Sequence, residues 1–121
     1  MTEIREPAVA GYFYPADAAA LGQTVAEMLG AARAARGDPP KALIVPHAGY
    51  AYSGPIAASA YARLTPYRDR YRRVVLLGPC HRVPVRGLAL SGADVFRTPL
   101  GDVRLDKAAM AGLRLPQVKV F

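Results

Sequence analysis

The sequence contains no tryptophan, only one cysteine and only two histidines among its 121 residues. Cys80 has no second cysteine with which to form a disulfide, and no charged segment followed by an apolar stretch opens the chain. Both absences are typical of proteins in the reducing cytoplasm, which is the location that we expect. Arg, Pro or Gly interrupts each apolar run within a few residues, so no segment is predicted to cross a membrane.

Acidic residues are also few, because nine Asp and Glu stand against 16 Lys and Arg, giving a formal charge of +7. An excess of this kind is one mark of nucleic-acid binding. Arg68, Arg70, Arg72 and Arg73 cluster, but in a predicted loop without a recognition helix or a basic and aromatic stacking platform. We therefore expect solvated basic faces and disfavour nucleic acid as a partner, an alternative that the salt dependence of binding would test.

What the chain does have is apolar residues, at 52% of the sequence with a mean hydropathy of +0.10. This is enough to build the core of one domain spanning residues 1–121. A helix is predicted over residues 17–36, because Asp17 can cap it, an apolar stripe follows and Gly37 can end it. A second helix is predicted over residues 55–64, with Pro55 in its first turn.

Two continuous apolar runs, residues 42–45 and 74–77, have the pattern of strands buried on both faces. With the helix at 55–64 between them, they predict a βαβ unit whose strands are parallel. Shorter elements are expected further on, namely strands at 88–90, 103–105 and 117–121 and a helix at 107–113. The predicted class is α/β, with a mainly parallel sheet and flanking helices.

His47 and His81 each follow one of the two apolar runs. Ligands bind at the carboxyl ends of strands in α/β sheets, where two imidazoles can converge on one metal ion. A hydrogen-bonded loop position is the more ordinary role of a histidine, so both interpretations stay open. A catalytic metal site also needs a third ligand, and Cys80, Asp94 and Asp102 are candidates without recognisable ligand spacing. Cys80 is alternatively a thiolate nucleophile or a small, partly buried residue.

Four motifs carry a resemblance to a known family: PAVAGYFYP (7–15), VPHAGYAYSG (45–54), LGPCHRVP (77–84) and FRTPLGDVRLD (96–106). In this order and spacing they resemble the Memo family, called AmmeMemoRadiSam system protein B in bacteria and archaea. The resemblance implies a fold similar to class III extradiol dioxygenases, here incomplete, and a divalent metal, iron or copper, on His47 and His81. The third ligand of the family is a cysteine of its C-terminal half, to which Cys80 does not correspond. The chain therefore looks like the N-terminal part of a longer protein.

The resemblance further implies that Tyr50, Tyr52, Ser53 and Cys80 line a pocket for substrate, with loop packing as the alternative for the first three. No catalytic residue is identified, and the ligand is an unknown small molecule or peptide. The leading hypothesis is a dioxygenase-like, metal-dependent oxidoreductase, and the alternative is a non-catalytic module that binds a partner or peptide. With two of three ligands, we expect weak metal binding and self-association. A pathway link to radical-SAM and AMMECR-like proteins is also implied.

Overall fold

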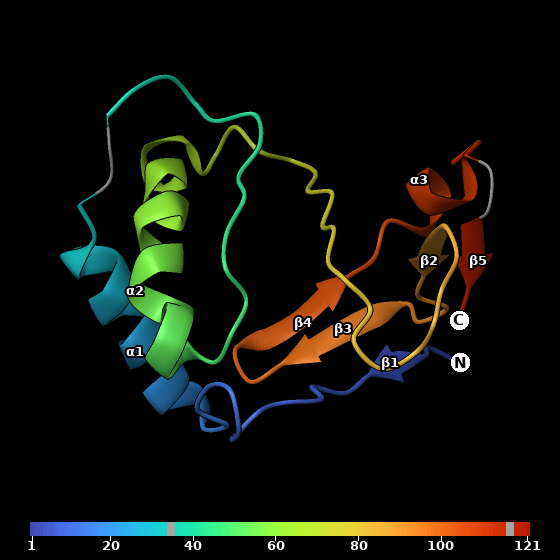
Figure 1. Cartoon of the computed structure of the whole chain (residues 1–121), viewed down its shortest axis with the longest axis horizontal. Coiled ribbons are helices and arrows are strands. Elements are labelled where there is room, and N and C mark those ends of the chain that lie inside the picture. Colours follow the sequence, from blue (N-terminus) through green and yellow to red (C-terminus); the bar gives the residue numbers. More distant parts are fainter. Residues whose placement is uncertain (34–35, 116–117) are drawn as a thin grey trace. The chain divides into compact units, whose positions relative to one another are not determined.

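The computed structural model describes residues 1–33, 36–115 and 118–121, and the chain forms two compact units (Figure 1). The helical unit comprises residues 8–74, and the sheet unit comprises residues 1–7 together with 75–121. Within the described residues, the helices are too short or too polar to cross a membrane.

The helical unit is built on two helices that pack against each other, α1 (Ala18–Ala31) and α2 (Tyr50–Tyr61). Asp17 caps α1 as predicted, because its Oδ2 accepts a hydrogen bond of 2.9 Å from the backbone N–H of Ala20. Leu21 of α1 and Ala58 of α2 are the buried apolar residues of this unit, each only 4% exposed. The 3₁₀ helix η1 (Ala62–Tyr67) continues α2.

Both helix boundaries differ from the prediction. The first helix ends at Ala31 rather than Arg36. Its end follows soon after Met28, which contacts α2. Residues 34 and 35 lie outside the described part of the chain. Packing rather than propensity supplies most of a helix's stability, so the helix does not extend on its alanines alone. The second helix begins at Tyr50 instead of Pro55. Pro55 lies inside α2, which tolerates the loss of the one backbone hydrogen bond that proline cannot donate.

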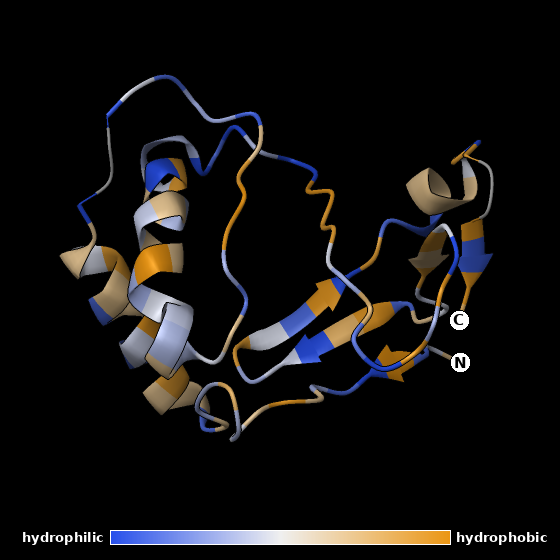
Figure 2. Ribbon diagram, in the orientation of Figure 1, coloured by the Kyte–Doolittle hydropathy of each residue, from blue (hydrophilic) through white to orange (hydrophobic). Residues whose placement is uncertain are grey.

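Residues 42–46 and 74–78 are not strands, so the predicted βαβ unit is wrong. Figure 2 shows both apolar runs on irregular segments. Ile44 is 100% exposed and Val75 85% exposed, and residues 74–77 are exposed throughout, whereas Leu43 and Val45 are half-buried. A strand needs a hydrogen-bonded neighbour, and a fully apolar strand also needs a cover on each face. Neither sheet in the described chain includes these runs, so the pattern is present without the partners that it requires.

The sheet unit contains two small sheets. One pairs β1 (Ile4–Arg5) parallel with β3 (Val95–Thr98), which pairs antiparallel with β4 (Gly101–Arg104). The other pairs β2 (Leu88–Leu90) parallel with β5 (Val118–Val120), while α3 (Lys107–Ala111) lies between β4 and β5 in the chain. The predicted strands near 88–90, 103–105 and 117–121 and the helix near 107–113 are thus found, with Gln117 outside the described residues.

The β3–β4 hairpin is the most regular part of the sheet unit. Its chain reverses at Pro99 and Leu100, and Gly101 follows with a φ of 136°, a conformation that a residue with a side chain rarely adopts. The hydroxyl of Thr98 accepts from the N–H of Leu100 at 3.1 Å and donates to the carbonyl of Gly101 at 2.8 Å. Val95, 5% exposed, anchors the hairpin in the small core of this unit.

The structure therefore confirms a mixed α/β class. The expectation of a mainly parallel sheet is corrected, because the larger sheet is mixed: β1–β3 is parallel and β3–β4 antiparallel. The reason is chain length between strands, since a short turn such as the one at Pro99 can join only antiparallel neighbours.

The contact between α1 and α2 predicts opposite effects for one substitution at two glycines. A Cβ on buried Gly54 would lie 2.5 Å from the Sδ of Met28, whereas a Cβ on exposed Gly30 meets nothing within 4 Å. Gly54→Leu should lower the free energy of unfolding by about 1–3 kcal/mol through overpacking. Gly30→Leu should raise it by about 0.5–1 kcal/mol through helix propensity. Urea denaturation followed by circular dichroism measures both, and a stabilised Gly54→Leu would contradict the packing described.

Candidate functional site

The segment that carries His47 is held on both sides within the helical unit. Before α2, the backbone N–H of Tyr50 donates to the carbonyl of Phe13 at 2.8 Å. The hydroxyl of Ser53 reaches back from the first turn of α2 and donates to the carbonyl of Ala48 at 2.7 Å. Gly49, the residue before α2, packs on the Phe13 backbone. The exposed imidazole of His47 thus projects from a segment whose backbone is fixed relative to α2.

The other residues predicted for this side of the pocket have different environments. Tyr50 is half-buried and its ring lies 5.6 Å from that of Tyr14; burial, followed by the proximity of Tyr14 and Tyr61, raises the pKa of the Tyr50 hydroxyl. Ser53 is 6% exposed and takes part in fixing the loop. Tyr52 is 87% exposed. Of these three residues, Tyr52 is the most exposed, whereas Tyr50 packs beside Tyr14 and Ser53 supports the loop.

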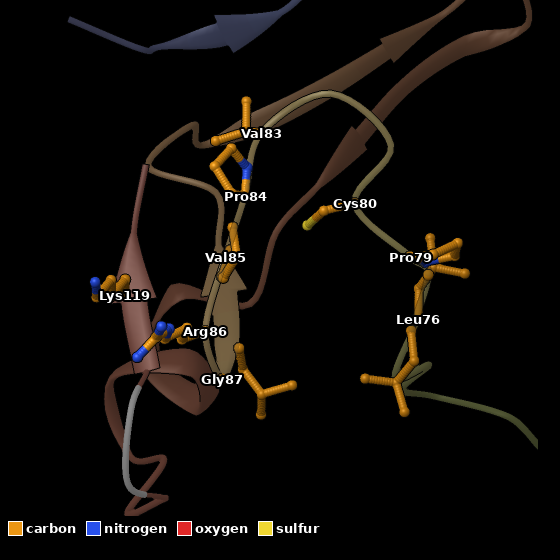
Figure 3. Close-up of a pocket in the computed structure, with 13 residues that line it drawn as sticks. Leu76, Pro79, Cys80, Val83, Pro84, Val85, Arg86, Gly87 and Lys119 are labelled. Atoms are coloured by element: carbon orange, nitrogen blue, oxygen red, sulfur yellow. The ribbon is translucent and has the colours of Figure 1, made fainter.

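A cavity of about 670 Å³ lies in the sheet unit beside the sequence that contains His81. Leu76, Pro79, Cys80, Val85 and neighbouring residues of 76–89 line it, together with Lys119 of β5. Figure 3 shows the Cys80 sulfur pointing into the space between the segment of Leu76 and Pro79 and that of Val85. Cys80 therefore lines this cavity and is exposed, while its role in a substrate pocket stays a prediction.

Sequence reasoning missed the charged residues of this cavity, which are Arg86 and Lys119. No local pattern could have indicated Lys119, because the parallel pairing of β5 with β2 brings it there from a distance of 30 residues along the chain, opposite Ala89. Most of the residues that line the cavity are apolar, with two cationic groups and a thiol among them, and no Asp or Glu of the described residues lines it.

The two histidines belong to different units, His47 to the helical unit and His81 to the sheet unit. A shared metal site at their imidazoles remains a prediction. Within residues 1–33, 36–115 and 118–121, no three His, Cys, Asp or Glu side chains gather closely enough to hold a metal ion. The described chain thus offers two exposed imidazole donors rather than a complete ligand set.

Both carboxylates considered as third ligands take part in ion pairs of the sheet unit. Asp94 accepts from the N–H of Glu3 at 2.8 Å and lies 3.5 Å from the ammonium of Lys107. The Glu3 hydrogen bond and then Lys107 hold the pKa of Asp94 below its ordinary value. Asp102 receives two hydrogen bonds, of 2.9 and 3.1 Å, from Arg97, which lower the pKa of that carboxyl. Asp94 therefore links Glu3 to Lys107, and Asp102 links β4 to β3.

These features define a mixed α/β protein with two exposed loop histidines. Comparison with known sequences gives its relationship: the family described as Memo-like protein matches residues 5–118. The chain is 44% identical over 109 residues to Protein MEMO1 of Danio rerio, covering 90% of this chain and 36% of that protein. It is 41% identical over 103 residues to Protein MEMO1 of Homo sapiens, covering 85% and 34%. It is 40% identical over 103 residues to a MEMO1 family protein of Aquifex aeolicus (strain VF5), covering 85% and 37%.

The chain therefore belongs to the Memo-like family, as its motifs predict. It spans about a third of the length of the curated relatives that it matches.

The ion pairs of Asp94 predict how acid affects the sheet unit. Because the folded-state pKa of Asp94 is lowered, its ionised form stabilises the fold above the ordinary Asp pKa of about 3.9, and this contribution is lost as the pH falls through the folded-state value. Asp94→Asn should therefore be less stable near neutral pH and lose less stability on acidification. Unfolding curves between neutral and acid pH measure this, with Asp69→Asn of the helical unit as a control. An equal acid response in both variants would contradict the assignment.

Proposed function

We propose that this chain is the metal-binding part of a Memo-like protein in which His47 and His81 supply two of three ligands. The observation that carries the proposal is that the only two histidines of the sequence fall in the two loop motifs, PHAGY and GPCH, of a chain that belongs to this family. Both side chains are exposed on loops, and the His47 segment is fixed by hydrogen bonds on either side. Neutral imidazoles of this kind bind iron, copper and zinc.

Two imidazoles fit such an ion only as part of a ligand set, since a catalytic site has three protein ligands and positions open to substrate. The ion pairs of Asp94 and Asp102 engage those carboxylates, so the proposal assigns neither of them as the third ligand. A bound iron or copper ion would activate dioxygen or polarise an oxygen-bearing substrate. The proposal thus includes a dioxygenase-like oxidoreductase with the extradiol-dioxygenase fold, located in the cytoplasm, where the exposed thiol of Cys80 stays reduced.

Titration with iron(II), copper(II) and zinc should show weak binding that needs both histidines. His47→Ala and His81→Ala should each lower the affinity at least about tenfold, since a metal held by two ligands loses half of its protein donors. Affinity should also fall on acidification, because imidazoles bind metal only when neutral. Calorimetry with metal analysis measures these effects.

Cys80→Ser is the matched control for the metal titration, because Cys80 neighbours His81 and does not correspond to the family cysteine. Its affinity should stay within about twofold of the parent chain. Unchanged binding in the doubly substituted His47→Ala/His81→Ala chain would overturn the proposed ligands.

A second candidate function is a non-catalytic module that binds a partner or peptide. It is favoured by the apolar run of residues 74–77, whose side chains are 78–85% exposed, and by the apolar residues that make up most of the lining of the adjoining cavity. Exposed apolar segments of this length mark association surfaces. If peptide binding without histidine-dependent metal binding were measured, this second function would replace the first.

The same exposed run predicts self-association of the isolated chain. Val75→Lys/Leu77→Lys should shift sedimentation toward monomer, because two charges within an apolar contact are costly to bury. Tyr12→Lys/Tyr52→Lys introduces the same charge at residues that are both 87% exposed and lie outside the run. Its association should remain close to that of the parent chain. Equal loss of association in both variants would assign the effect to net charge instead of the run.

A further inference from the structure

The helical unit joins two segments that are distant in the sequence, residues 36–41 and 63–73. Three side chains of the second segment donate to backbone carbonyls of the first: Tyr67 Oη to Gly37 at 2.5 Å, Tyr71 Oη to Pro40 at 2.6 Å and Arg63 Nη2 to Asp38 at 3.5 Å. A Cβ on Gly37 would lie 3.3 Å from the Arg63 guanidinium, so the segments are in close contact. We call residues 36–41 and 63–73 together the basic surface.

The basic surface carries most of the protein's net charge. It contains seven of the 16 Lys and Arg residues and two of the nine acidic residues, a formal charge of +5 out of +7 for the chain. Its cationic residues are Arg36, Lys41, Arg63, Arg68, Arg70, Arg72 and Arg73. Six of them are exposed and Arg63 is half-buried. Residues 63–73 contribute +4 of this charge, and their contact with residues 36–41 adds the remaining +1.

The chemistry of these side chains fits phosphate. Six of the seven cations are arginines, whose planar guanidinium groups can donate two parallel hydrogen bonds to one phosphate. The turn that presents them is ordered, because the N–H of Arg70 donates to the carbonyl of Tyr67 at 2.8 Å and its guanidinium lies 5.6 Å from the centre of the Tyr67 ring. A repeating polyanion could engage several of these groups at once.

The surroundings of the arginines distinguish among polyanions. Within the basic surface no large apolar side chain is strongly exposed, but Val74, which directly follows Arg73, is 83% exposed, so an anionic lipid surface is the rival that the experiment must separate from a duplex. Tyr67 and Tyr71 are half-buried with their hydroxyls engaged, and Arg70 covers the Tyr67 ring, so stacking of unpaired bases is disfavoured. Contact with phosphates alone is how a duplex is bound without reading its sequence, and it requires neither base stacking nor an inserted side chain.

We propose that the basic surface binds the phosphate backbone of a double-stranded nucleic acid. The hydrogen bonds that Tyr67 and Tyr71 donate place Arg36 and Lys41 in the same surface as the arginines of residues 63–73. This function is independent of the proposed metal ligands, because the surface does not include His47 or His81.

The test is fluorescence anisotropy of labelled 20-base-pair DNA and RNA duplexes with the full 121-residue chain over a range of salt concentrations. Each neutralised phosphate contributes about −0.9 to the slope of log affinity against log salt. Arg68→Gln/Arg70→Gln/Arg72→Gln should reduce the size of the slope by about 2–3 and lower affinity at least about tenfold at 0.1 M salt. Arg36→Gln/Lys41→Gln should reduce the slope by about 1–2, although these residues lie some 30 positions away in the sequence.

Arg82→Gln/Arg104→Gln/Arg114→Gln is the matched control, because it removes the same charge from exposed residues of the sheet unit. It should change affinity by less than about threefold. The proposal is overturned if the control loses as much affinity as the triple variant, or if the parent chain fails to bind duplex at 0.05 M salt. Tighter binding to vesicles of phosphatidylserine and phosphatidylcholine, or to single strands, would overturn it in favour of that partner. Circular dichroism of each variant checks that its helices are retained.

Discussion

A strand exists only where another strand accepts and donates its backbone hydrogen bonds, and this requirement governs the whole structure. Where the described chain meets it, small sheets form: β1, β3 and β4 make one, and β2 and β5 make another. Residues 42–45 and 74–77 have the apolar composition of central strands and belong to neither sheet. Their exposed side chains are therefore the main unsatisfied feature of the molecule, and the proposed self-association follows from them.

The helical unit is held together by the close packing of α1 against α2. Gly54 allows Met28 to approach α2, and Leu21 and Ala58 complete the contact. Side-chain hydroxyls then tie irregular backbone to this framework: Ser53 binds the His47 segment, and Tyr67 and Tyr71 bind residues 37–40. Both functional proposals for this unit depend on such bonds, because they fix loops that have no secondary structure of their own. A small core thus positions the imidazole of His47 and also assembles the basic surface.

Membership of the Memo-like family gives the two histidine motifs a common context, and the structure adds the local environment of each. The His47 segment is fixed beside α2, and the sequence around His81 borders a cavity lined mostly by apolar residues, with one thiol and two cationic side chains. The carboxylates that seemed available for a third ligand instead stabilise the sheet unit: Asp94 joins Glu3 and Lys107, and Asp102 pairs with Arg97. In the proposed metal site, the histidines are therefore the ligands that the described residues would supply.

The sequence alone determined what depends on neighbouring residues. The cap of α1 at Asp17, the short helix near Lys107, the strands after Gly87 and the family motifs all follow from local pattern. Tertiary structure decided whatever depends on distant partners. It left the apolar runs at 42–45 and 74–77 outside the sheets, committed Asp94 to Lys107, brought Lys119 to the cavity and joined residues 36–41 to the arginines of 63–73. The physical reason is that a capping bond or a turn is closed within a few residues, whereas a strand, an ion pair or a charged surface is completed only by groups that folding brings from elsewhere.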